Sequence, residues 1–315
     1  MSRFAKIGLP LSCTGFGLIL GVCYERNKGH FNFLTSENIL KAEGRFKDDC
    51  VKEQFLSDTL QSFFPTVYAS SQLIKPRSRL QEIFTFGEPS FDPLRPFEDH
   101  VVLYDRRNRV PHWVFEHIRK EHVEKNENVT RPSGFTEDQS IHPFFRATDS
   151  DYRGSGYDRG HMAAASNHRH SQKAMDDTFF FTNIAPQVGK GFNRGVWKDL
   201  EKYVRVLARK HRNVYVCTGP LYLPRLEPDG KLYVKYEVIG KNNVSVPTHF
   251  FKVVVMENEK GEFAMNSFVI PNQIFPKNTP LKNFEVPVEE IEKAAGFLLF
   301  EGVPKHKLKK INENI

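Results

Sequence analysis

Apolar and polar positions alternate over short stretches between residues 100 and 118, as is typical of β-strands. Residues 100–104 and 113–115 form two such stretches, and the polar residues 105–109 between them predict a turn. This part of the chain therefore predicts an antiparallel β-hairpin. Further strands are expected at 178–182, 213–218, 232–239, 248–256 and 264–270.

A longer period of three to four residues runs from residue 194 to residue 210 and predicts an amphipathic helix. Its apolar positions share one side, as a face packed on a core should. They are Val196, Leu200, Tyr203, Val204 and Leu207. Basic side chains lie within about 80° of one another on a different side. They are Arg194, Lys198, Lys202, Arg205, Arg209 and Arg212.

Strands outnumber helices in the remainder of the chain, with a second short helix expected at 288–295. Prolines and glycines interrupt residues 119–160, which predicts a long functional loop there. Helices and strands mixed in this way indicate an α+β fold with a central, mainly antiparallel sheet.

Four segments are expected along the chain. Residues 1–24 form an apolar leader, and residues 25–95, which show no sustained period, form a linker or a loosely attached extension. Residues 96–303 form the main folded domain, and residues 304–315 form a basic tail.

The leader contains a charge-free stretch, residues 7–24, preceded by Arg3 and Lys6. A cleaved secretory signal has this order of basic and apolar residues. A membrane anchor normally needs about 20 apolar residues, so the stretch is borderline for one. A mitochondrial sorting segment is the third interpretation, and the sequence leaves all three open.

The formal net charge of +7 suits a polyanionic partner, either nucleic acid or an anionic membrane surface. A basic organellar protein without such a partner would have the same charge. Of the four cysteines, only Cys50 and Cys217 lie outside the leader, which excludes a disulfide framework. Cys217 lies in a strand-like run and is expected in the core.

The run Asp158-Arg159-Gly160-His161 is the strongest candidate for chemistry, and it is expected to be a loop between two strands. A histidine accepts a proton near neutral pH, so His161 can activate water for phosphodiester hydrolysis. Gly160 permits a close backbone approach beside it. Two alternatives remain open. His161 is a surface histidine without a catalytic role, or it binds zinc with His168 and His170, although their spacing matches no usual ligand pattern.

Asn193 lies at the beginning of the predicted helix, and Glu201 lies about two turns further on, at the border of its basic side. An amide oxygen at Asn193 is able to hold a mostly hydrated magnesium ion. Asparagine is also among the best helix N-caps, and on residue type alone the cap is the preferred role. The basic side of the helix is either a solvated face or a phosphate-binding ridge, and its single sign of charge favours phosphate.

Dense matches with one known family run through roughly residues 96–300. They cover 104–107, 149–165, 182–187, 192–193, Trp197, 200–201, 218–221 and 246–252. In these segments the chain resembles the DNA/RNA non-specific nucleases of the ββα-metal (His-Me finger) fold, and most closely their mitochondrial endonuclease G branch. The related exonuclease branch commonly carries Ser where Asp158 stands, so Asp158 favours the endonuclease branch.

The resemblance implies a role for each matching residue. His161 would be the general base, and Asn193 the single direct protein ligand of Mg²⁺, with Mn²⁺ as a substitute. Glu201 would orient a metal-bound water. Asn183 would help to position the site, and Arg159 would support the site or the phosphate.

The resemblance also implies a function. The protein would cut double- and single-stranded DNA and RNA without sequence preference, leaving 5′ phosphates, and would form a homodimer. Its leader would direct it to the mitochondrial intermembrane space, touching membrane through residues 7–24 before processing, with relocation to the nucleus and DNA degradation in apoptosis. Arg131 is a further candidate for binding phosphate, although the irregular segment leaves that match open.

Two rival functions remain at this point. The first is a catalytically inactive homologue that only binds nucleic acid, which removal of His161 would leave unchanged. The second is a secreted nonspecific nuclease with the same chemistry, which cellular location would distinguish.

Overall fold

The computed structural model describes residues 79–86 and 94–312. The chain divides into two compact units, Met1–Glu88 and Pro89–Ile315. In the first unit the described residues form one short helix, α2 (Arg79–Ile83). In the parts of the chain that the structure describes, no helix is long and apolar enough to cross a membrane. The expected leader lies outside the described residues.

The second unit is built on a seven-stranded sheet. In spatial order its strands are β1 (Leu94–Pro96), β2 (His100–Asp105), β3 (Val110–Ile118), β6 (Asn213–Leu221), β11 (His249–Glu257), β12 (Phe263–Pro271) and β13 (Leu308–Ile311). All neighbours pair antiparallel except β12 and β13. The hairpin expected between residues 100 and 118 is confirmed, as are the strands expected after residues 212, 247 and 263.

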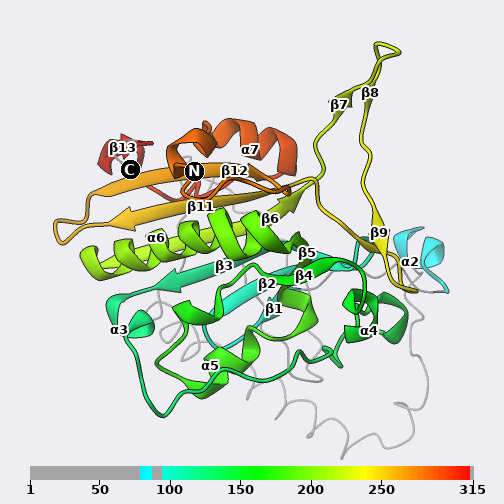
Figure 1. The fold of residues 1–315 in the computed structure, drawn as a ribbon, viewed down its shortest axis with the longest axis horizontal. Helices are drawn as coiled ribbons and strands as arrows, with labels where there is room; N and C mark the ends of the chain where they lie inside the picture. The colour runs from blue at the N-terminus through cyan, green and yellow to red at the C-terminus, as the bar shows by residue number, and fades with distance from the viewer. Residues whose placement is uncertain (1–78, 87–93, 313–315) are drawn as a thin grey trace, which may run out of the picture. The chain divides into compact units, whose positions relative to one another are not determined.

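Helices cover both faces of this sheet. Helix α6 (Trp197–Lys210) lies across strands β3, β6 and β11 in Figure 1, and its Val204 packs with Val254 of β11. The neighbouring β11 residues Val253 and Val255 turn to the other face and pack with Ile291 of α7 (Val288–Ala295). Because successive strand residues point to opposite faces and both faces are covered, β11 is apolar from Phe250 to Met256 except at Lys252.

A two-stranded hairpin precedes α6 in the chain. Strand β4 (Tyr157–His161) pairs antiparallel with β5 (Ile184–Val188), and an irregular helical turn, η4 (Gly189–Val196), leads from β5 into α6. Two strands followed by a helix are the order that the ββα-metal resemblance implies. The α+β fold class is confirmed. The expected core side of α6 is confirmed as well, since Leu200, Val204 and Leu207 are buried.

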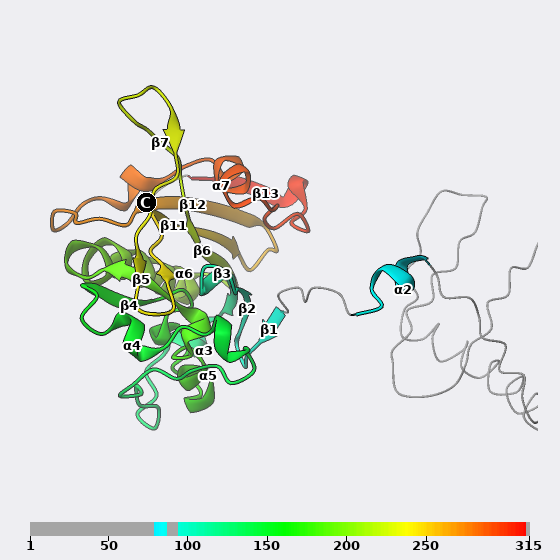
Figure 2. The ribbon, with the colours of Figure 1, turned by 90° about the vertical axis from the view of Figure 1, so that its right-hand side faces the viewer.

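Short elements make up the rest of the second unit. They are α3 (Lys120–Val123), η1 (Pro143–Phe145), α4 (Asp149–Tyr152), η2 (Ala165–Asn167), α5 (Gln172–Asp177), η3 (Phe181–Asn183), β7 (Arg225–Leu226), β8 (Leu232–Tyr233), β9 (Val238–Ile239), β10 (Val244–Ser245), η5 (Leu281–Phe284) and η6 (Lys305–Lys307). Strands β7 and β8 form a ribbon that projects from the body of the unit in both ribbon views (Figures 1 and 2).

Three expectations about local structure are wrong. Residues 158–161 are not a loop but most of strand β4. Residues 178–182 are not a strand: Phe179 and Phe181 are buried by a tight turn after α5, and the strand β5 follows them. Residues 232–239 split between two ribbons, β7–β8 and β9–β10. Apolar alternation over a few residues does not distinguish a buried turn from a strand.

The central core gives a prediction about stability. Phe268 on β12 is fully buried, and its ring meets the ring of Tyr203 edge to face at 6.2 Å. Phe268→Ala is expected to lower the free energy of unfolding by about 3–5 kcal/mol, because it leaves a cavity between the sheet and α6. Denaturant unfolding measures this. Phe144→Ala is the matched control, since Phe144 is 76% exposed, and a loss as large as that of Phe268→Ala would contradict this account of the core.

Candidate active site

His161 ends strand β4, where it lies opposite Ile184 of β5. The side chain is nearly buried, and its ring meets Phe179 edge to face at 4.8 Å and lies 5.4 Å from Phe135. The strand before it needs a glycine at 160, since a Cβ there would lie 2.1 Å from the side chain of Gln187. The close approach expected at Gly160 is therefore real, and Gln187 is the group that approaches.

The imidazole of His161 is neutral and has one nitrogen free. Burial and the nearby positive charge of Arg131 lower its pKa to about 3, against a smaller opposing effect of a hydrogen bond to the Arg159 backbone. Nε2 is buried and has no hydrogen-bond partner. A neutral imidazole with an unpaired nitrogen keeps the lone pair that a general base needs, and the negative charge of a bound phosphate would raise this pKa again. The interpretation of His161 as an exposed surface histidine is wrong.

Asn183 fixes the chain immediately after His161. Its Oδ1 accepts a hydrogen bond from the Ala163 backbone N–H at 2.9 Å, while Nδ2 donates to the backbone oxygens of Ala163 and Thr178 at 3.0 and 2.8 Å. The Asn183 carbonyl also accepts from the N–H of Met162. This amide is fully buried and engaged at both ends, so it holds the backbone of Ala163 and Thr178 in place.

Arg159 is held on the outer side of the same strand. Its guanidinium pairs with the Asp149 carboxylate at 2.7 Å and donates to the Asp149 carbonyl oxygen at 3.1 Å. It also lies over the rings of Phe135 and Tyr152, at 5.8 and 5.5 Å from their centroids. Phe135 also contacts the His161 ring, so Arg159 stabilises the ring against which His161 packs.

Asn193 lies in the irregular turn η4, not at the N-cap of α6, which is Val196. The N-cap role is therefore wrong. Its Nδ2 donates to Asp158 Oδ2 at 2.8 Å, and the same carboxylate pairs with Arg194 at 2.6 Å. With the nitrogen held in this way, the orientation of the amide is fixed and Oδ1 is the atom left to bind a cation.

Glu201 lies half-buried about one turn into α6, among several positive charges. Burial raises its pKa to about 7, and Lys252, Arg205 and Arg131 oppose that rise. Lys252 is fully buried: its Nζ donates to Thr218 Oγ1 and, at 3.5 Å, to the carbonyl oxygen of Met162, the residue after His161. One buried ammonium group thus connects the end of β4 with Glu201.

The structure brings some of the expected site residues together and leaves others linked only through neighbours. Arg131 is close enough to influence the pKa values of both His161 and Glu201, and its guanidinium lies over Phe179. Among the described residues, no hydrogen bond or ring contact joins His161 to Asn193. Their connection runs through Asp158, which lies on the same strand as His161 and holds Asn193.

Sequence reasoning missed three contributors to the site. Asp158 was used only to choose between branches of the family, although it lies in the same motif as His161. Arg205 was counted in the basic ridge, but it is half-buried beside Glu201. Lys252 stands inside an apolar strand run, where a lone lysine is a signal, because a fully buried lysine needs acidic or polar partners.

Oxygen ligands in this region fit a magnesium ion. Magnesium keeps several waters and needs only one or two protein oxygens, and Asn193 Oδ1, oriented by Asp158, supplies one. The neutral, unpaired Nε2 of His161 is suited to a proton rather than to this hard cation. Among the described residues, one group of His, Asp, Glu and Cys has metal-site spacing, formed by Asp99, His122 and His170. It does not include His161, which speaks against the zinc alternative at that residue.

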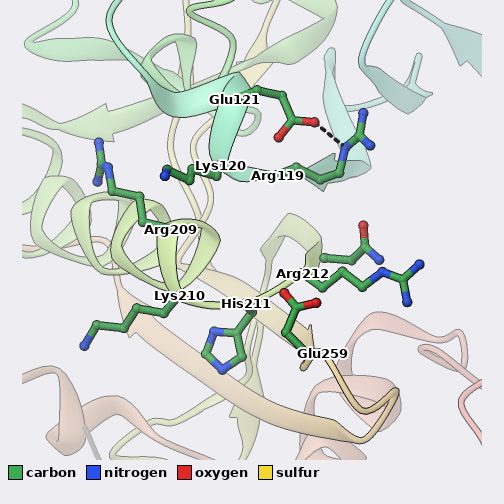
Figure 3. A pocket seen from close by; sticks show the side chains of 9 residues that line it. Arg119, Lys120, Glu121, Arg209, Lys210, His211, Arg212 and Glu259 are labelled. Atoms are coloured by element: carbon green, nitrogen blue, oxygen red, sulfur yellow. Dashed lines mark ion pairs between the residues drawn. The ribbon is translucent and has the colours of Figure 1, made fainter.

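A basic hollow lies at the far end of α6 from Asn193. Its volume is about 410 Å³, and Figure 3 shows that the residues lining it come from the start of α3, from the end of α6 and from the turn around residue 259. Cationic groups dominate the lining, with an ion pair between Arg119 and Glu121 at 2.9 Å. The lining residues are Arg119, Lys120, Glu121, Arg209, Lys210, His211, Arg212, Asn213 and Glu259. None of the expected catalytic residues is among them.

Comparison with known proteins matches residues 81–306 to the model of the DNA/RNA non-specific endonuclease family. The chain is 51% identical to human mitochondrial endonuclease G over 222 residues, which cover 70% of this chain and 74% of that protein. It is 46% identical to the Caenorhabditis elegans mitochondrial endonuclease G, over 75% of this chain and 77% of that one. A solved EndoG/EndoGI complex contains a chain that is 55% identical with a TM-score of 0.69, covering 76% of this chain and 98% of that chain.

The buried, neutral His161 predicts how stability depends on pH. Its folded-state pKa is about 3, below the usual value of 6.5, so the folded protein resists protonation while the unfolded chain accepts it. The contribution of neutral His161 to the free energy of unfolding is therefore complete above pH 6.5 and is lost as the pH falls toward 3. In chelator-treated protein, the wild type should lose up to about 2 kcal/mol more unfolding free energy than His161→Gln between pH 7 and pH 5.

Denaturant unfolding at a series of pH values measures this difference. His306→Gln is the control, because His306 is exposed and should leave the wild-type dependence in place. Identical pH dependence in the wild type and His161→Gln would mean that His161 is not buried in its neutral form.

Proposed function

Since this chain belongs to the DNA/RNA non-specific endonuclease family, we propose that it hydrolyses phosphodiester bonds of DNA and RNA with His161 as the general base. The observation that carries the proposal is the unpaired Nε2 of a neutral imidazole at the end of β4. Nε2 takes a proton from water as that water attacks phosphorus in line with the leaving 3′ oxygen. The products carry a 5′ phosphate.

Asn193 would hold a magnesium ion through Oδ1, with water filling most of the remaining positions. Such an ion, when bound, stabilises charge on the phosphate and on the leaving 3′ oxygen. Asp158 supports this role, since it accepts from Asn193 Nδ2 at 2.8 Å and so holds the oxygen of the amide in one direction. Outer-shell groups of this kind commonly change metal affinity by about 10- to 100-fold.

Arginines beside the base would bind the phosphate. Arg131 is exposed and is supported from behind by the ring of Phe179, so its donors are available to an incoming phosphate. Arg205 is half-buried next to Glu201 and donates to Asn167 Oδ1 at 3.4 Å. Glu201 balances these positive charges and hydrogen-bonds to water near the phosphate. Asn183 and Arg159 keep the residues around His161 in position.

The rest of the nucleic acid would follow the basic side of α6. Lys198, Lys202 and Arg209 are exposed on this helix, and the hollow of Figure 3 continues the positive surface beyond its end. Contacts to phosphates carry no information about base identity, so DNA and RNA, double- or single-stranded, are all substrates. Binding should weaken steeply with salt because counterions are released.

The cellular setting is proposed from the relatives. Those quoted above carry mitochondrial names, and the basic, apolar order of the leader fits import into the mitochondrion. We place the protein in the intermembrane space as a homodimer, with nuclear DNA as its substrate in apoptosis. In this proposal residues 96–303 form the nuclease domain and residues 25–95 tether it to the leader at 1–24. Residues 304–315 form its basic C-terminal segment, which adds β13 to the sheet.

The role of His161 is tested by separating cleavage from binding. His161→Ala in the full-length chain should cut plasmid DNA and RNA about 10²- to 10⁴-fold more slowly than the wild type, the usual range for loss of a general base. Its affinity for a non-cleavable oligonucleotide should change by less than about threefold. Gel-based digestion and fluorescence anisotropy give the two numbers, and His306→Ala serves as the control. Unchanged cleavage by His161→Ala would favour another base or a protein that does not cut.

The metal ligand is tested through Asn193 and its support. Asn193→Ala should lose magnesium-dependent cleavage. Asp158→Ala should raise the magnesium concentration for half-maximal rate about 10- to 100-fold, with much of the rate recovered at saturation. Arg194→Ala is the matched control, because it removes the other partner of Asp158 and leaves the Asn193 bond in place.

Titration of magnesium against the rate of plasmid cutting measures these effects. Full activity of Asn193→Ala in magnesium would remove Asn193 as the ligand. Cleavage by the wild type that persists in excess chelator would contradict a metal-dependent mechanism altogether.

A further inference from the structure

Three side chains from distant parts of the sequence meet beside the start of the main sheet. Asp99 comes directly before β2, His122 lies in α3, and His170 follows η2 just before α5. Each offers one ligand atom, and the three atoms lie within 4.8 Å of one another. None of these residues belongs to the catalytic site described above.

Both histidines have nitrogens that the protein leaves unsatisfied. Nδ1 of His122 and Nδ1 of His170 are buried and have no hydrogen-bond partner, and His122 as a whole is only 8% exposed. The two rings stack at a centroid distance of 4.4 Å with an angle of 21° between them. An unpaired buried polar atom costs free energy, so two in one cluster indicate a missing partner.

The carboxylate of Asp99 points toward His170 and His168. Asp99 Oδ2 lies 3.0 Å from His170 Nε2 and 3.4 Å from Nδ1 of the buried His168. Its side chain is 16% exposed and that of His170 is 29% exposed, so solvent reaches the cluster from one side. An ion can therefore enter without opening the core.

We propose that Asp99, His122 and His170 form a binding site for a divalent transition metal of the zinc class, separate from the magnesium at Asn193. Two imidazole nitrogens and one carboxylate oxygen are a common zinc ligand set, with a fourth position open to water. Imidazole nitrogen disfavours magnesium, which prefers oxygen ligands. Ligands of tetrahedral zinc lie roughly 3.3 Å apart. The three ligand atoms here lie within 4.8 Å of one another, so small rotations of the partly exposed Asp99 and His170 side chains would complete the site.

The bound ion would join three chain segments that otherwise meet only by packing and hydrogen bonds. His168 carries the connection further inward: its Nε2 lies 3.0 Å from Glu116 Oε1, which also accepts from Asn167 Nδ2 at 3.0 Å. Asn167 in turn accepts from Arg205 of α6. The site therefore stabilises the side of the domain on which α3 and α5 pack, and its first measurable effect is on metal affinity and thermal stability.

The experiment uses tag-free, full-length protein stripped of metal and titrated with Zn²⁺ by calorimetry, then with Co²⁺ by visible absorption. The wild type and the control His306→Gln should each bind one zinc ion at this site, and tetrahedral Co²⁺ should give visible bands. Asn193→Ala should retain both signals, which separates this site from the catalytic one. A hundredfold excess of zinc over Kd should raise the wild-type melting temperature by about 5 °C or more.

His122→Gln and His170→Gln should each weaken zinc binding at least tenfold and, at the same zinc concentration, reduce the melting shift to about half of the wild-type shift or less. His170→Gln carries the test if the more buried His122→Gln does not fold. Zinc affinity and Co²⁺ spectra in folded His170→Gln that equal those of the wild type would overturn the proposal, as would a wild type that binds no zinc. In either case the cluster is held by hydrogen bonds alone.

Discussion

The carboxylate of Asp158 is the contact on which the arrangement of the site depends. It lies three residues before His161 on β4, and it holds both Asn193 and Arg194 in the turn that leads into α6. That turn is irregular and contains Gly191 at a φ of 83°, so its own backbone does not fix the direction of Asn193. A charge-assisted hydrogen bond from the neighbouring strand fixes it instead.

Burial shifts the pKa values of two further site residues, His161 and Glu201, in opposite directions. It lowers the pKa of His161 to about 3, so the base stays neutral, and it raises the pKa of Glu201 to about 7. The positive charges of Arg131 and Lys252 act in the same region: Arg131 disfavours a charged His161, and both favour an ionised Glu201. One set of charges thus keeps His161 unprotonated and favours an ionised Glu201.

Long, strongly patterned segments could be predicted from the sequence, and short ones could not. Helix α7 matches its expected bounds, and α6 was found from the stripe that buries Leu200 and Val204. The polar run at residues 158–161 predicts a loop, but these residues belong to strand β4, which pairs only with β5 in a separate two-stranded sheet. The motif makes His161 a candidate, and the start of the predicted helix makes Asn193 one. The hydrogen bond between Asp158 and Asn193 joins residues 35 positions apart and has no local pattern. The cluster of Asp99, His122 and His170 could not be predicted from the sequence for the same reason, because its residues lie far apart along the chain.

The central claim is that Asn193 binds the catalytic metal while His161 stays free to accept a proton. Crystals grown with Mn²⁺ and a non-cleavable oligonucleotide test it most directly, because anomalous scattering locates the ion independently of the refined protein. The account predicts a peak about 2.2 Å from Asn193 Oδ1, with His161 Nε2 outside the coordination sphere and within hydrogen-bond distance of a water. A peak bonded to His161 Nε2, or none beside Asn193, would contradict it.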